Sequence, residues 1–68
     1  MPDTLAARVA RLREKAGWTQ RELGRLAGLG HGTVSKIEAG ERGVKRPSLA
    51  MLSKLAAALG VPLSKLVE

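Results

Sequence analysis

The chain has 68 residues and no cysteine, so it is long enough for one domain, residues 1–68, and lacks the disulfides or cysteine-bound zinc that stabilise many small domains. Its 12 Lys and Arg against 6 Asp and Glu give a formal net charge of +6, which favours an anionic partner. A single aromatic residue, Trp18, argues against the stacking surfaces that bind single-stranded nucleic acid, so duplex is the favoured form.

The first predicted helix follows a capping residue, Asp3 or Thr4, and ends before Gly17, which suits a left-handed position after a helix. Its apolar residues recur at helical spacing on one face: Leu5, Val9, Leu12 and Ala16. The spacing predicts an amphipathic helix with its charged residues facing solvent.

The second helix is predicted from about Gln20 to Ala27 and has the strongest start signal in the chain. Thr19 and Glu22 have the spacing of a capping box, in which each side chain accepts a hydrogen bond from a backbone N–H at the helix start. A hydrophobic staple is expected from the pair that flanks this start, Trp18 and Leu23. Gly28 ends the helix.

The third helix is predicted from about Gly30 to Ala39, with Val34 and Ile37 on its buried face. The segment that follows, GERGVKRP, has the composition of a turn. It contributes three cations, Arg42, Lys45 and Arg46.

Ser48 is the predicted cap of a fourth helix, which ends at Gly60. Its apolar stripe consists of Leu49, Leu52, Leu55, Ala56 and Leu59. A last short helix follows Pro62 and offers three residues for burial, Leu63, Leu66 and Val67. No alternating run indicates a strand, so the sequence predicts an all-α domain of five short helices.

The second and third helices are expected to form a corner. Gly24 and Gly28 allow close approach and a tight turn, and the neighbouring apolar residues bury the shared face. Two helices joined by a short glycine-containing turn form a helix-turn-helix unit. The polar residues expected on the outward face of its second helix are His31, Thr33, Ser35 and Lys36.

The run WTQRELGRLAGLGHGTVSKIEAGERGVKRPSLAMLSKLAAALGVPLSKLVE resembles the phage repressor and Cro family of helix-turn-helix proteins, often called the Xre family. The resemblance extends to the first helix, LAARVARLREKAG. It implies a compact five-helix lambda-repressor-like domain and a homodimeric transcriptional regulator, of repressor or restriction-controller type, that binds double-stranded DNA at a near-palindromic operator. The recognition helix, about residues 30–39, is expected in the major groove.

The resemblance also implies which residues contact DNA. The expected base contacts are His31, Gly32, Ser35 and Lys36. The expected contacts to the DNA backbone are Gln20, Arg21, Thr33, Arg42, Lys45 and Arg46. Lys36 can donate to guanine O6 and N7, and the plainer alternative is a hydrated surface lysine. For His31 the plainer alternative is an exposed histidine without a partner.

Two further expectations follow from the resemblance. Arg13 and Glu38 match family positions that form an ion pair between the first helix and the end of the third. The region that the family uses for dimerisation contains Val61, Leu63, Leu66 and Val67, some of which must fill the core of the monomer.

The chain departs from the family pattern at three glycines. Gly24 replaces the usual alanine, Gly30 replaces the usual Ser or Thr cap, and Gly32 has no side chain to contact a base. These departures predict a recognition helix that is weakly determined on its own and specificity that depends partly on DNA shape.

The sequence argues against several other classes of function. GLGHG follows no strand and lacks the full dinucleotide-binding spacing, and Ser35 with His31 lacks a third orienting group, so no enzyme and no cofactor are expected. No apolar run reaches the ~18 residues that span a membrane, and no signal-peptide pattern is present, so a cytoplasmic location is expected. The main alternative is an antitoxin-type interaction module that binds a partner toxin as well as its own operator.

Overall fold

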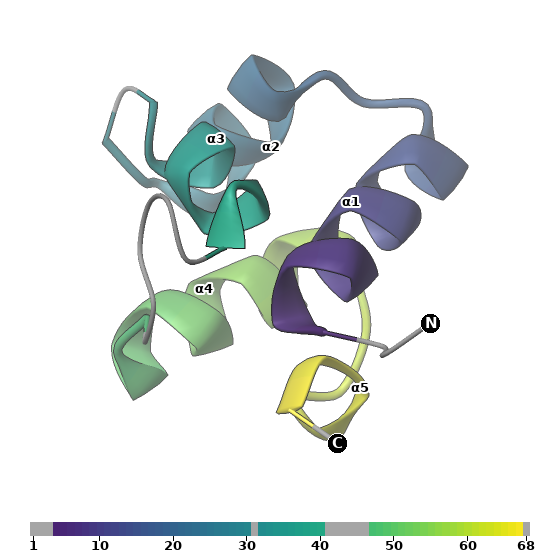
Figure 1. The fold of residues 1–68 in the computed structure, drawn as a ribbon, viewed down its shortest axis with the longest axis vertical. Helices are drawn as coiled ribbons and strands as arrows, with labels where there is room; N and C mark the ends of the chain where they lie inside the picture. Colours follow the sequence, from purple (N-terminus) through teal and green to yellow (C-terminus); the bar gives the residue numbers. More distant parts are fainter. Residues whose placement is uncertain (1–3, 31, 41–46, 68) are drawn as a thin grey trace.

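The computed structural model describes residues 4–30, 32–40 and 47–67, and all its regular structure in these ranges is helical (Figure 1). The helices are α1 (Leu5–Ala16), α2 (Gln20–Ala27), α3 (Thr33–Glu38), α4 (Leu49–Leu59) and α5 (Ser64–Val67). The predicted all-α fold of five helices is confirmed. Within the same ranges, none of the helices combines the length and the apolar character that crossing a bilayer requires.

The helix starts follow the capping signals in the sequence. At the start of α2, the Thr19 hydroxyl accepts from the Glu22 backbone N–H at 3.0 Å, and a Glu22 carboxylate oxygen accepts from the Thr19 N–H at 2.9 Å. Thr4 caps α1 and Ser48 caps α4 in the simpler way, each through its side-chain oxygen. These bonds satisfy backbone donors that have no partner inside the helix, and they fix where each helix begins.

The third helix begins later than the sequence predicts. The expected start near Gly30 is wrong, because α3 begins at Thr33 and is six residues long. Gly32 precedes it with φ of +77°, a left-handed conformation that the helix cannot include, and glycine offers no side-chain cap. The turn of the helix-turn-helix corner therefore extends to Gly32.

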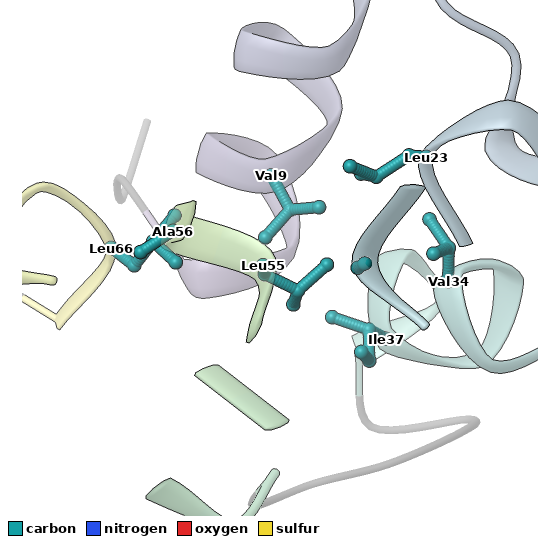
Figure 2. Close-up of a cluster of buried hydrophobic side chains, with 8 residues drawn as sticks. Val9, Leu23, Val34, Ile37, Leu55, Ala56 and Leu66 are labelled. Atoms are coloured by element: carbon teal, nitrogen blue, oxygen red, sulfur yellow. The ribbon is translucent and has the colours of Figure 1, made fainter. Parts of the chain in front are cut away.

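Every helix contributes to one hydrophobic core (Figure 2). The largest fully buried side chains come from all five helices: Val9, Leu23, Ile37, Leu55 and Leu66. Figure 2 shows Val9 and Leu55 at its centre, with Leu23, Val34 and Ile37 on one side and Leu66 beside Ala56 on the other. The core thus joins the α2–α3 corner to the opposite, C-terminal end of the domain.

Two positions on the predicted apolar stripes are exposed. Leu49 is 66% exposed, and Ala16 is exposed as well. Both are terminal residues of their helices, and in Figure 1 the first turn of α4 extends beyond α1 and α5. Helical periodicity predicts the face on which a residue lies but not whether a neighbouring helix reaches that far.

The last helix is held against the first. Leu66 is fully buried, and its carbonyl accepts a hydrogen bond from Arg8 Nη1 of α1 at 3.1 Å. Leu66 is therefore one of the residues of the expected dimerisation region that fill the core of the monomer. Of the same group, Val67 is exposed, whereas Val61 and Leu63 are half-buried against the core.

Gly24 lies in the middle of α2, where glycine stabilises a helix less than alanine does. A Cβ added there would lie 3.6 Å from Val34 Cγ2, an ordinary packing distance. Gly24→Ala should raise the free energy of unfolding by about 1 kcal/mol, because alanine loses less backbone entropy in a helix. Urea unfolding measures the change.

Gly28→Ala is the control for this substitution. Gly28 has φ of +69°, where a Cβ is strained even though no atom lies within 4 Å of it, so this variant should lose about 1 kcal/mol. If both substitutions were destabilising to the same extent, packing at Gly24 would be tighter than the structure indicates.

Candidate nucleic-acid interface

The corner between α2 and α3 is closed by backbone geometry. Gly28 adopts a left-handed conformation at the end of α2, and the Leu29 N–H donates to the Gly24 carbonyl at 2.8 Å. The chain then reverses through Gly30 and Gly32 into α3, where the Thr33 N–H donates to the Gly30 carbonyl at 3.1 Å. α3 is thereby packed against α2 from its first turn.

The short third helix has one side in the core and another in solvent. Val34 and Ile37 are buried, and Ser35 and Lys36, which were expected to contact bases, are exposed. Gly32 is exposed immediately before the helix. His31, the fourth expected base contact, lies outside the described residues. The three described members of this set therefore lie together on the outer side of the corner.

The residues expected to contact the DNA backbone fall into two groups. Gln20 and Arg21 form the first turn of α2, where Arg21 is exposed and Gln20 is half-buried, and Thr33 is half-buried at the start of α3. Arg42, Lys45 and Arg46 lie outside the described residues. The structure thus brings the start of α2 and the start of α3 to the same corner.

Arg13 and Glu38 form a bidentate ion pair. Arg13 Nε donates to Glu38 Oε2 at 2.7 Å, and Arg13 Nη2 donates to Oε1 at 3.1 Å. Arg13 Nη1 also donates to the Trp18 carbonyl at 2.7 Å. The hydrogen bond to Glu38 raises the pKa of Arg13 above its usual value, so the guanidinium stays charged. One side chain therefore joins α1, the α1–α2 loop and the last residue of α3.

Gln20 connects α2 to this ion pair between α1 and α3. Its Nε2 donates to Glu38 Oε1 at 3.0 Å, so the carboxylate holds both the start of α2 and the end of α1. The sequence contains one amide side chain, at the first position of a strongly capped helix, which signals a role for Gln20 but not its partner. One N–H of the Gln20 amide is used by Glu38, and the second is left to contact another group.

A hollow of about 530 Å³ opens in the corner between the two helices. Its lining combines two arginines of α2 with apolar and glycine residues: Gln20, Arg21, Gly24, Arg25, Leu29, Gly30, Gly32, Val34 and Ser35. Sequence reasoning assigned no role to Arg25 and expected Leu29 only to help bury the shared face of the corner. Gly24, Gly30 and Gly32 were recognised in the sequence as departures from the family pattern. The sequence did not predict the hollow that they line.

The capping box of α2 makes part of the stability depend on pH. The pKa of Glu22 lies below its usual 4.5, chiefly because the carboxylate accepts the hydrogen bond from the Thr19 N–H. A carboxyl whose pKa is lowered in the folded protein stabilises the fold at pH values above its pKa in the unfolded chain. This stabilisation is lost as the pH falls through the lowered pKa of the folded protein. Glu22→Gln keeps an acceptor in the box but does not titrate.

The stability difference between the wild type and Glu22→Gln should therefore shrink as the pH is lowered from neutral to well below 4.5. Urea unfolding of both proteins over that range measures it. A difference that is independent of pH would mean that the Glu22 carboxylate has the same pKa in the folded and unfolded chains.

Comparison with known proteins relates the chain to a protein family. The sequence pattern of the helix-turn-helix family matches residues 9–66. A search of curated proteins finds no match.

Several solved structures are similar over nearly the whole chain. The hypothetical transcription factor NHTF from Neisseria is 38% identical, with a TM-score of 0.84 over 94% of this chain and 70% of its own. The restriction-modification controller protein C.AhdI from Aeromonas hydrophila is 34% identical, with a TM-score of 0.80 over 91% of this chain and 89% of its own. SinR, a master regulator for biofilm formation solved in complex with DNA, is 28% identical, with a TM-score of 0.87 over 96% of this chain and 100% of its own. The DNA-binding domain of SinR is from Bacillus subtilis.

Proposed function

Because the chain belongs to the helix-turn-helix family, we propose that it is a transcriptional regulator that binds double-stranded DNA in a sequence-specific manner. The likeness to C.AhdI and to SinR in complex with DNA supports this function. The observation that carries it is the division of α3 into a buried face and an exposed polar face beside Gln20 and Arg21 at the start of α2. A helix with an exposed polar face is what reading of a major groove requires.

In this proposal α3 enters the major groove, and its exposed residues contact base edges. A groove about 12 Å wide admits one helix. Ser35 and Lys36 are the described side chains with access to bases, and Gln20, Arg21 and Thr33 contact the sugar-phosphate backbone beside them. The amide N–H of Gln20 that Glu38 does not use is the donor for a phosphate oxygen.

Lys36→Ala tests the base contact. A lysine that donates to guanine contributes roughly 1–3 kcal/mol, so loss of it should weaken binding to a selected duplex by about 5- to 150-fold. Binding to random duplex should weaken much less, because base readout is lost and phosphate contacts remain. Fluorescence anisotropy at fixed salt measures both.

Lys54→Ala is the matched control. Lys54 is an exposed lysine of α4 that is not part of the lining of the α2–α3 hollow, and its loss should change both affinities by less than about twofold. If the two variants lost the same affinity for the selected duplex, Lys36 would contribute only its charge and no base contact.

We further propose that the regulator acts as a homodimer. Val67 of α5 is 55% exposed, and Val61 and Leu63 are half-buried beside it, so an apolar surface is available at the C-terminal end. Two copies related by a twofold axis would present two α3 helices to half-sites about 10 bp apart. Sedimentation should show a dimer at micromolar concentration, and a monomer at high micromolar concentration would contradict this part of the proposal.

A second candidate function is that of an antitoxin-type module. Leu26 is 54% exposed on α2 and Leu49 is 66% exposed on α4, and both lie outside the surface proposed for dimerisation. A partner protein would cover exposed apolar side chains of this kind. A pull-down from the source cell that recovers a stoichiometric partner enzyme would favour this candidate, and recovery of operator DNA alone would favour the regulator.

A further inference from the structure

The hollow between α2 and α3 has no role in the contacts proposed above. Its volume of about 530 Å³ is in the range of clefts that enclose ligands, roughly 300–1,000 Å³. It lies between residues proposed to contact phosphate, Gln20 and Arg21, and a residue proposed to contact bases, Ser35. A DNA strand held by these residues therefore has to pass across its opening.

The floor of the hollow is formed by glycines and apolar residues. Gly24, Gly30 and Gly32 contribute no side chain to the lining, and Val34, which is buried, lies beneath Gly24. Leu29 is half-buried and packs against the core with part of its side chain, so the remainder offers apolar surface to the hollow. The polar residues that line the hollow, Gln20, Arg21, Arg25 and Ser35, are exposed or half-buried, so the floor offers no buried donor for a free anion.

The rim of the hollow is positive. Arg21 and Arg25 lie four residues apart on α2, so their side chains share a face of the helix, and both are exposed. This charge is complementary to the phosphates of a DNA strand. An occupant of the hollow should therefore combine an apolar group with an adjacent phosphate.

We propose that the hollow receives the 5-methyl group of a pyrimidine, thymine or 5-methylcytosine, in the strand whose phosphates lie against Arg21 and Arg25, and that Leu29 is a specificity-determining residue. The 5-methyl group is the apolar feature of a pyrimidine in the major groove, and apolar side chains read it by contact. This inference rests on the proposed function, since it requires duplex DNA at the corner.

The test begins with two selections from random duplex pools, one made with thymine and one with uracil in its place. Uracil lacks only the methyl group, so the thymine pool alone should yield a fixed pyrimidine at one position of each half-site. In a single duplex from the thymine pool, uracil at that position should weaken binding about fourfold, the equivalent of one buried methyl group. Cytosine and 5-methylcytosine at the same position form a second pair, which distinguishes the two methylated bases.

Variants of Leu29 connect the methyl effect to the hollow. Leu29→Ser should reduce the fourfold preference for thymine over uracil to less than about 1.5-fold, whereas Leu29→Met keeps the apolar surface and should retain it. The preference is a ratio within one protein, so it can be measured on the folded fraction even where Leu29→Ser lowers the melting temperature.

The outcomes separate this inference from the proposed function. If no duplex is enriched over random DNA, both are overturned. If a specific duplex is bound but the methyl group has no effect at any position in either pair, the inference is overturned and the proposed function stands. Retention of the thymine preference by Leu29→Ser would also overturn the assignment.

Discussion

Glu38→Ala should lower the free energy of unfolding by about 3 kcal/mol, because it leaves a largely buried guanidinium without its carboxylate. The Arg13 side chain is 13% exposed and that of Glu38 is 8% exposed, so water can replace little of what is lost. Gln20 loses its acceptor in the same step. For a domain of this size the melting temperature should fall by roughly 10–20 °C.

Glu14→Ala is the matched control, because Glu14 also lies near Arg13. Its Oε2 is 3.9 Å from Arg13 Nη2, but its side chain is 70% exposed, so its loss should cost less than about 0.5 kcal/mol. Glu38→Gln should fall between the two, since it keeps the shape and some hydrogen bonds without the charge. If Glu38→Ala and Glu14→Ala had equal effects, the ion pair would not hold the α2–α3 corner.

Leu66→Ala should also cost about 3 kcal/mol, although the residue lies near the end of the chain. Its side chain is fully buried beside Ala56 (Figure 2), and truncation leaves a cavity between α4, α5 and α1. Because the lost contacts are within one monomer, the change in stability should be independent of protein concentration. Urea unfolding at two concentrations, tenfold apart, measures both quantities.

Val67→Ala separates the core from the proposed dimer surface. Val67 follows Leu66 directly but is 55% exposed, so its truncation should change monomer stability by less than about 0.5 kcal/mol. It should instead weaken self-association in sedimentation experiments. A loss of stability for Leu66→Ala that disappears at high protein concentration would return Leu66 to the interface.

The helix boundaries were predictable wherever a side chain signals them. Thr19 and Glu22 identify the start of α2 because a capping box is a local device, complete within four residues. Gly17, Gly28 and Gly60 identify helix ends for the same reason, since a left-handed residue ends a helix whatever surrounds it. The pattern from Gln20 to Ile37 therefore predicts the corner and the family.

The sequence could not predict features that depend on contacts between distant residues. Gly30 and Gly32 carry no side chain, so nothing local indicates which of them precedes α3. The hydrogen bond of Gln20 to Glu38 joins residues on different helices, and no periodicity reports it. Leu66 and Val67 are equally apolar in sequence, and only the packing of α5 on α1 and α4 separates the buried residue from the exposed one.

The central claim, sequence-specific binding of duplex DNA through α3, is tested most directly by the affinity of the protein for a selected duplex and for random duplex across a range of salt concentrations. The selected duplex should bind at least about 1,000-fold more tightly than random DNA. Both affinities should fall with salt, with a log–log slope near −0.9 for each phosphate neutralised. Equal affinity for all duplexes, or an affinity that does not change with salt, would contradict the claim.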